Sequence, residues 1–267
     1  MTEAGPLVVC LAAAALYALG GRGRTRIWRE LSFYGGVASV LIVLEPPFDT
    51  WADTSFALHM VQHVVLLTVA PPLLVLGRPW PRLWLPFPLR VRRAVARGLA
   101  GSAAFRLVGR TLTRPPVALA VMSATLGIWH VPALYDAAVE HEGIHVAEHV
   151  CFVFTALLYW GPLLEAPPVR ARIDHLRRAG WFAAAMIPGW ILAVVLTFAS
   201  TPLYGAYASL AHRPGGLSAL ADQQLAAGVM LVPGSLVFFL AAFVSVYRWL
   251  EPGTVPLEPR SEELSWT

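Results

Sequence analysis

Charged residues are scarce in this sequence, and lysine is absent. Only 13 % of the 267 residues are charged, and all 20 cationic residues are arginines. Soluble domains carry about 25 % charged residues, whereas this chain is 57 % hydrophobic with a mean hydropathy of +0.61. The composition therefore excludes an ordinary soluble domain and indicates a polytopic membrane protein. The net charge of +4 belongs to membrane loops, so we expect no nucleic-acid partner.

Cysteine is nearly absent as well, which limits the chemistry open to the chain. Cys10 and Cys151 lie in different apolar segments and form no Cys-x-x-Cys motif. We therefore expect neither a structural disulfide nor a cysteine-based zinc site. No nucleophile–base arrangement and no glycine-rich phosphate-binding loop stand out in the sequence, so we do not expect an enzyme.

Seven apolar segments predict an all-α fold, a membrane bundle of about seven transmembrane helices within residues 1–250. A span needs about 20 apolar residues, and the first two segments are shorter than that. The segments cover approximately residues 6–20, 31–46, 55–77, 115–133, 144–164, 181–200 and 223–247. Residues 251–267, with several Pro, Gly and Glu, are expected to form a disordered cytoplasmic tail.

The loops alternate in charge, and this alternation predicts the orientation of the bundle. Loops 21–30 and 165–180 carry four Arg each, and loop 78–114 carries nine Arg and no acidic residue. Loops 47–54 and 134–143 carry two and three acidic residues and no Arg. Because arginine-rich loops stay in the cytoplasm, we expect the N-terminus outside and the C-terminus inside.

The arginine-rich loop leaves two interpretations open. Its segments Val91–Arg97 and Phe105–Arg110 interleave Arg with apolar residues. Such segments can form amphipathic helices that lie on an anionic inner leaflet. The alternative is a solvated basic loop.

Two pairs of histidines have the spacing of one helical turn. His59 and His63 lie in the third apolar segment, and His145 and His149 open the fifth. Residues four apart share a helix face, so each pair can chelate one transition-metal ion, and imidazole suits copper, zinc and iron alike. In the predicted orientation both pairs lie toward the outer side, with His130 at the outer end of the fourth segment. We therefore predict a metal site made of these five histidines.

Other residues near these histidines could support the site with a soft ligand or with hydrogen bonds to the ligands. They are Met60, Gln62, Glu148, Cys151, Asp222 and Gln223. Asp222 opens the last segment and either caps its own helix or orients a ligand imidazole. For any one outer histidine taken alone, a simpler role remains open: it reaches the interface or forms a hydrogen bond between helices.

Prolines interrupt two of the apolar segments. Pro71-Pro72 lies in the third and Pro233-Gly234 in the seventh. Proline has no backbone N–H and clashes with the preceding helical turn. We expect these two helices to be kinked or loosened there.

Several motifs resemble those of the CtaG family of bacterial cytochrome c oxidase assembly factors. They are His59-Met-Val-Gln-His63, Ala70-Pro-Pro-Leu-Leu-Val-Leu-Gly77, Trp129-His-Val-Pro-Ala-Leu-Tyr135, His145-Val-Ala-Glu-His149, Asp222-Gln-Gln-Leu-Ala-Ala-Gly228 and Val232-Pro-Gly234. The resemblance implies a multi-pass protein of the bacterial cytoplasmic membrane, with the lipid bilayer and the oxidase subunits as partners. It also implies a role in maturing a haem–copper oxidase, with copper as the metal handled. The residues alone leave zinc and haem open.

Two other functions remain open from the residues alone. Opposed histidines in a helical bundle can ligate haem for electron transfer. Histidines that line a path can also carry protons or metal ions through a transporter. The inner halves of the third to fifth segments have almost no polar residues, which argues against a path through the membrane.

Overall fold

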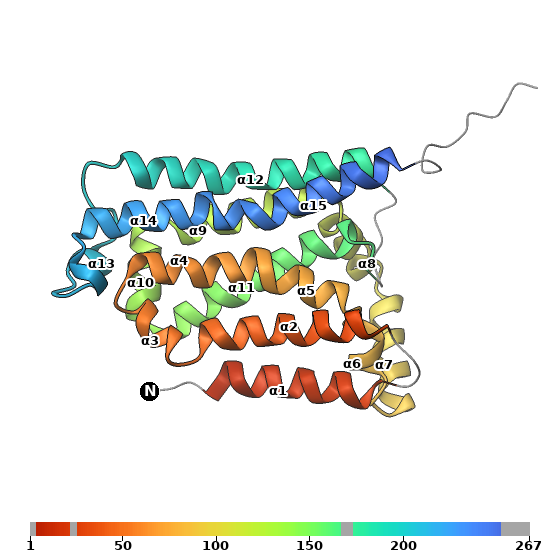
Figure 1. The fold of residues 1–267 in the computed structure, drawn as a ribbon. Coiled ribbons are helices and arrows are strands. Elements are labelled where there is room, and N and C mark those ends of the chain that lie inside the picture. Colours follow the sequence, from red (N-terminus) through yellow and green to blue (C-terminus); the bar gives the residue numbers. More distant parts are fainter. Residues whose placement is uncertain (1–3, 22–25, 167–172, 252–267) are drawn as a thin grey trace, which may run out of the picture.

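The computed structural model describes residues 4–21, 26–166 and 173–251. Helices account for almost all of these ranges, no strand occurs in them, and the long helices run side by side in one bundle (Figure 1). The all-α prediction is confirmed. Residues 252–267, which include nearly all of the predicted tail, lie outside the described ranges.

In the part of the chain that the structure describes, five helical stretches are long and apolar enough to cross a membrane. They are α2 (Ile27–Leu44), the stretch Phe56–Leu76, α11 (Glu142–Leu163), α12 (His175–Phe198) and the stretch Ala219–Leu250. A sixth arises if α9 (Pro115–Trp129) and α10 (Pro132–Glu140), which meet at 74°, form one broken span. The remaining candidate, α1 (Ala4–Leu19), is apolar but shorter. Length and composition thus support five or six spans and do not confirm the predicted seven.

Polar side-chain caps set the beginnings of four helices in the described ranges, one of them α8 (Ala103–Leu112), which Ser102 caps. The side chain of Ser55 accepts a hydrogen bond from the first turn of α4 (Phe56–Val64), and Ser218 does the same for α14 (Ala219–Leu231). Asp174 caps α12 in the same way, so this helix begins at His175 rather than near the predicted residue 181. Such caps satisfy N–H groups that have no partner inside the helix.

The predicted loosening at Pro71-Pro72 takes the form of a π-helix. Between α4 and α5 (Ala70–Leu76), residues Val65–Val69 form the π-helical segment η1. In a regular α-helix the Leu67 carbonyl would accept a hydrogen bond from residue 71, but proline has no N–H to donate. Trp160 Nε1 of α11 donates to that carbonyl instead, at 3.0 Å. The carbonyl that the proline leaves without a helical donor is therefore used in a specific hydrogen bond between two central helices.

Two hydrophobic clusters hold the helices together. In the larger one, Trp160 stacks on Phe238 of α15 (Pro233–Leu250), with ring centroids 4.9 Å apart. In the smaller one, Tyr17 of α1 stacks on Phe33 of α2 at 3.9 Å. The Tyr17 hydroxyl also donates to the Gly77 carbonyl at 2.9 Å. The first two helices are thereby fixed to the central stretch.

The bundle has two ends of different composition (Figure 1). One end carries the N-terminus, α10, α3 (Phe48–Ala52), α13 (Gly205–Ala208) and the 3-10 turn η2 (Pro214–Gly216). The other carries α6 (Pro79–Trp84), α7 (Leu89–Gly101), α8 (Ala103–Leu112) and the end of α15. We call them the histidine end and the arginine end. Which end faces the cytoplasm remains a prediction.

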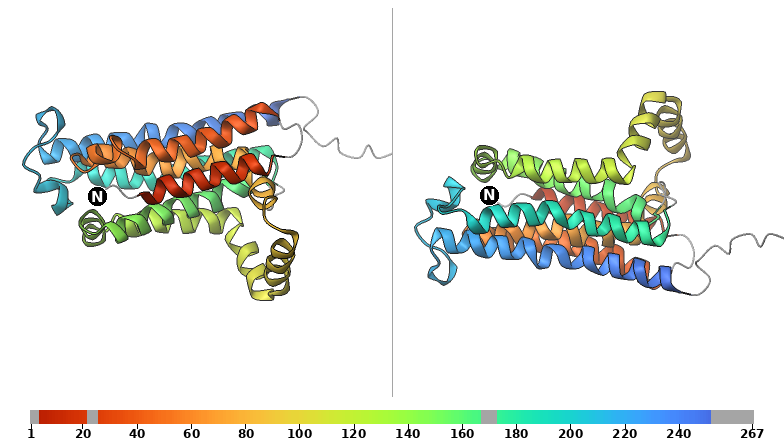
Figure 2. Two further views of the ribbon diagram at one scale, coloured as in Figure 1. Left: turned by 90° about the horizontal axis from the view of Figure 1, so that it is seen from below. Right: turned by 90° about the horizontal axis from the view of Figure 1, so that it is seen from above.

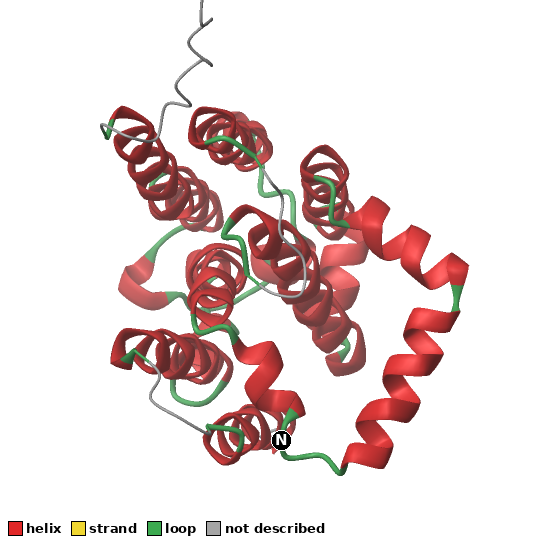
Figure 3. Cartoon of the chain, turned by 90° about the vertical axis from the view of Figure 1, so that its right-hand side faces the viewer, coloured by secondary structure: helices red, strands yellow, loops and turns green. Residues whose placement is uncertain are grey.

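The arginine-rich loop is helical. Helices α7 and α8 project sideways from the bundle (Figures 2 and 3). Apolar side chains on them, such as Val91, Phe105 and Leu107, are exposed. Of the two interpretations above, the structure therefore agrees with amphipathic helices. Their contact with the inner leaflet stays a prediction.

Candidate metal site

Asp222 holds the beginning of α4 in place. Its carboxylate accepts hydrogen bonds from Ser55 Oγ (2.7 Å) and from the backbone N–H groups of Phe56 (2.8 Å) and Ala57 (3.1 Å). An anion at this position is also favoured by the dipole of α4. Of the two alternatives left open for Asp222, a cap of its own helix is wrong, because Ser218 is that cap. Both oxygens of Asp222 bind the start of α4 rather than an imidazole.

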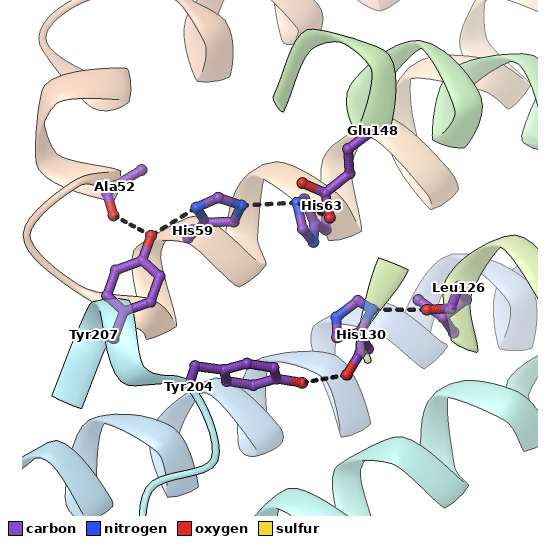
Figure 4. A network of polar contacts seen from close by, with 8 residues as sticks. All are labelled: Ala52, His59, His63, Leu126, His130, Glu148, Tyr204 and Tyr207. Atoms are coloured by element: carbon purple, nitrogen blue, oxygen red, sulfur yellow. Dashed lines mark hydrogen bonds and ion pairs between the residues drawn. The ribbon is translucent and has the colours of Figure 1, made fainter. Parts of the chain in front are cut away.

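His59 and His63 on α4 face Glu148 and His149 on α11. One potential ligand atom of each residue lies within 4.8 Å of those of the other three. His59 Nε2 is 2.9 Å from His63 Nε2, which is 3.6 Å from Glu148 Oε1 (Figure 4). None of the four residues is more than 8 % exposed. An ion held by this cluster, which we call the four-ligand cluster, would be shielded from water.

Tyr207 fixes the tautomer of His59. The Tyr207 hydroxyl donates to the Ala52 carbonyl oxygen at 3.0 Å, so its oxygen accepts the proton of His59 Nδ1 at 2.7 Å (Figure 4). Burial holds the pKa of Tyr207 well above its usual value, so the phenol keeps the proton that it donates. His59 Nε2 therefore carries a lone pair directed at the cluster, which is the state that a metal ligand requires.

Several buried atoms of the cluster have no hydrogen-bond partner among the described residues. They are both carboxylate oxygens of Glu148, Nε2 of His149 and Nδ1 of His63. A buried carboxylate without a hydrogen-bond partner costs several kcal/mol, on the order of what one desolvated ion costs. A cation held between Glu148 and the imidazoles would offset that cost. Three imidazoles and a carboxylate fit a first-row transition-metal ion.

His130 lies beside the cluster. Its Nδ1–H donates to the Leu126 carbonyl at 2.8 Å, which leaves Nε2 as a lone pair without a partner among the described residues. Its ring centroid is 5.7 Å from that of His63. His130 is therefore placed to assist the cluster but is not one of the four closely spaced ligands.

His145 lies on the other side of the cluster. Its ring centroid is 4.2 Å from that of His149 and 5.0 Å from that of His59. The structure thus brings the five predicted histidines together from three parts of the chain. Three of them share the closest spacing with Glu148, which we had expected only to support the ligands.

The two glutamines predicted to support the site bind elsewhere. Gln62 Nε2 donates to the Val43 carbonyl (2.7 Å) and to Asp49 Oδ1 (3.0 Å), which ties α4 to α2 and α3. Gln223 accepts from the Leu203 backbone N–H at 2.7 Å and donates to a carbonyl of α12. Both therefore act on the packing of the helices.

The two sulfur-bearing candidates have different environments. Met60 is fully buried in the larger hydrophobic cluster, which also contains Phe56 and Phe152. Cys151 is a free thiol on α11, partly exposed, and it is not one of the four closely spaced ligands. The donors at the closest spacing are therefore nitrogen and oxygen atoms.

Tyrosines at the histidine end were not predicted. The ring centroid of Tyr135 lies 5.5 Å from that of His59 and 4.1 Å from that of Tyr204. Tyr204 and Tyr207 come from the loop between α12 and α14, and burial raises the pKa of Tyr204 as well. The spacing of three residues between Tyr204 and Tyr207 was the sequence feature that could have indicated them. A loop, however, has no periodicity that shows where its side chains point.

Comparison with known proteins identifies the family. The family described as cytochrome c oxidase caa3 assembly factor (Caa3_CtaG) matches residues 11–251. Uncharacterised proteins of Mycobacterium bovis and Mycobacterium tuberculosis are each 23 % identical to this chain over 254 residues. These matches cover 92 % of this chain but only 38 % of each relative, so the chain spans well under half of their length. No solved structure matches the chain.

The family match covers nearly the whole chain, so this protein belongs to the Caa3_CtaG family of cytochrome c oxidase assembly factors. The resemblance inferred from the sequence motifs is confirmed.

Proposed function

We propose that this member of the caa3 assembly factor family binds copper at the four-ligand cluster and delivers it to an oxidase subunit. The role is non-catalytic: the protein holds the ion and passes it on. The histidine end faces the outside of the bacterial cytoplasmic membrane, where the oxidase receives the metal. The lipid bilayer and the oxidase are its partners.

The observation that supports this proposal is the group of four buried ligands. His59, His63, Glu148 and His149 come from two helices that are fixed by contacts outside the cluster, through Asp222 and Trp160. The cluster therefore forms without needing the ion to assemble it. Buried lone pairs that meet no donor are costly unless they serve a ligand. The donor set also suits zinc and iron, and the family is the reason for choosing copper.

Haem fits this geometry less well. Two axial imidazoles of a haem lie on opposite sides of the macrocycle, so the ring must fit between their nitrogens. Here His59 and His63 share one helix and have Nε2 atoms 2.9 Å apart, and His63 and His149, on two helices, have ring centroids 5.5 Å apart. Aromatic rings occupy the nearby space, with Phe152 at 4.7 Å from the His63 ring and Tyr135 at 5.5 Å from the His59 ring.

Transport through the membrane is also less well supported. A cavity of about 60 Å³ lies next along α4 from His63, toward the arginine end. The described residues that line it are mainly apolar. They include Val64, Leu67, Met122 and Phe238. A metal or proton path needs polar side chains to continue across the bilayer. The cluster is therefore better suited to holding an ion at one side.

Metal analysis of the purified protein tests the proposal. Protein prepared without chelators should contain copper, and His63→Ala should lose most of it because one imidazole of the closely spaced set is gone. His175→Ala is the control, since His175 begins α12 outside the cluster. A visible absorption band would identify haem instead, whereas histidine-bound copper(I) gives almost none. Equal copper in both variants, with equal folding, would contradict the proposal.

A further inference from the structure

A cavity of about 300 Å³ opens beside the four-ligand cluster at the histidine end. Its lining comes from the start of α1, from the end of α2 and the segment between α2 and α4, from α10 and from the start of α11. The titratable residues that line it are Glu45, Asp49, Asp53, Glu140, Glu142, His145 and His149. None of the described residues that line it is an arginine. Five carboxyl groups therefore surround one space next to the imidazoles.

His149 belongs to both the cavity and the cluster. It lines the cavity and is one of the four closely spaced ligands, although its side chain is only 8 % exposed. Its Nε2 has no hydrogen-bond partner among the described residues. His145, with its ring 4.2 Å from that of His149, also lines the cavity. His145 and His149 thus line the same cavity as the carboxylates, and His149 also belongs to the buried cluster.

The carboxyl groups of the cavity are crowded. Glu45 Oε1 is buried without a hydrogen-bond partner among the described residues. Burial, and after it the nearby Asp49 carboxylate, raises the pKa of Asp53. At the opening, Asp53, Glu140 and Glu142 are exposed to solvent. A cation in this space would relieve the repulsion between the carboxylates, which attract it from solution in turn.

We propose that this carboxylate cavity is the route by which a metal cation reaches the four-ligand cluster. The inference rests on the proposed function, because the cluster must be the place where the ion is held. The carboxylates act through their charge: a soft ion such as copper(I) binds oxygen weakly and therefore moves on to the imidazoles. His145 and His149 receive it first, and the other members of the four-ligand cluster, His59, His63 and Glu148, complete its coordination. The ion keeps its charge throughout.

Matched double variants test this route. In Asp53→Asn/Glu140→Gln two charges are removed at the cavity, and Asp49 is left intact because it holds the Gln62 amide. The control, Glu165→Gln/Asp174→Asn, removes two charges at the arginine end. Asparagine caps helices about as well as aspartate, so α12 keeps its cap in the control.

The measurement is the rate of copper uptake. Metal-free protein in detergent is mixed anaerobically with copper(I) supplied as its cationic acetonitrile complex, and copper per protein is determined at intervals after rapid desalting. In low salt the cavity variant should load about tenfold more slowly than wild type, the lower end of typical electrostatic effects on association. The difference should shrink in about 0.5 M salt because exposed charges are screened. The control should load at the wild-type rate, and all three proteins should reach the same final copper content.

The outcomes separate this inference from the proposed function. Wild-type protein that takes up no copper at any time contradicts the proposed function itself. Wild-type uptake with equal rates in both double variants overturns the route and leaves the cluster standing. A cavity variant that folds as wild type but has a lower final copper content also overturns it, because the carboxylates would then belong to the holding site. Size-exclusion elution and thermal unfolding establish the folding of each variant.

Discussion

The two ends of the bundle differ in whether their acidic side chains are paired and exposed to solvent. At the arginine end, Arg82 pairs with Glu30 at 2.8 Å, Arg178 pairs with Glu165, and the acidic partners are substantially exposed. At the histidine end, Glu148 is fully buried and its oxygens accept no hydrogen bond from the described residues. Charges that satisfy one another stabilise a fold, whereas buried groups left unsatisfied need another reason to persist. The contrast supports the proposal that the histidine end binds a ligand, whereas the ion pairs at the arginine end join neighbouring helices.

The largest expected effect concerns the side of the membrane on which each end lies. Reporter fusions after Arg26, Arg97 and Arg177 should behave as cytoplasmic, and fusions after Asp53 and Glu142 as external. The reason is the retention of arginine-rich segments in the cytoplasm. Alkaline phosphatase and fluorescent-protein fusions read the two sides in opposite senses. Mixed signals within either set would remove the basis for comparing the two ends.

Loss of the gene should affect copper in the oxidase rather than the amount of oxidase. We expect a deletion strain to keep oxidase polypeptide and haem synthesis but to lose oxidase copper and activity, with partial rescue by added copper. The intact gene should complement it, and the His59→Ala/His63→Ala variant should not, provided that the variant inserts into the membrane. Full oxidase copper and activity in the deletion strain would refute the assembly role and favour the haem interpretation.

Stability should depend several-fold more on the buried carboxylate of Asp222, which is fully hydrogen-bonded, than on an exposed carboxylate of the arginine end. Asp222→Ala removes three hydrogen bonds to a buried carboxylate and should lower the free energy of unfolding by about 3 kcal/mol. Glu30→Gln, which weakens a partly exposed ion pair at the arginine end, should cost less than about 1 kcal/mol. Chemical unfolding in detergent measures both. Equal losses would mean that burial does not separate the Asp222 carboxylate from the exposed Glu30 carboxylate.

The smallest effect is expected from the hydroxyl that orients His59. Tyr207→Phe leaves His59 Nδ1–H without its acceptor and should weaken copper binding about 10- to 100-fold, the usual effect of losing such a partner. Competition with a copper(I) chelator gives the affinity. Tyr247→Phe is the control, because Tyr247 lies on α15 and its side chain is 58 % exposed. Unchanged affinity in Tyr207→Phe would show that the hydroxyl only packs.

The helical spacing of the sequence predicted which histidines come together in the candidate site, but not the residues around them. Pairs four residues apart had to share a face, so His59 with His63 and His145 with His149 could be expected to converge once their helices packed. The sequence predicted only a supporting role for Glu148. Its sequence neighbours do not show that its side chain points at the other helix. Tyr207 reaches His59 from 148 positions away, through a loop whose conformation is set by tertiary packing. The same is true of Asp222, whose partners lie on another helix.

For the fold, too, the sequence predicted the features that depend on local pattern and missed those that depend on tertiary packing. Apolar runs predicted the long helices, and their ends moved by several residues where a cap such as Asp174 intervened. The number of spans was harder, because a run of apolar residues does not reveal the 74° bend between α9 and α10. Proline at position 71 indicated a weakened helix, but the π-helix and its bond from Trp160 depend on the neighbouring α11.

The π-helix also determines how the faces of α4 are rotated about the helix axis relative to those of α5. A π turn accommodates one more residue than an α turn, and one residue corresponds to about 100° of rotation around a helix axis. The face of α4 that carries His59 and His63 is therefore rotated relative to the face of α5 beyond Val69 by the presence of that extra residue. Deleting one residue within Val65–Val69 would keep every histidine in the sequence. It would nevertheless turn both imidazoles away from Glu148 and His149 for as long as α5 and Trp160 stayed packed as they are.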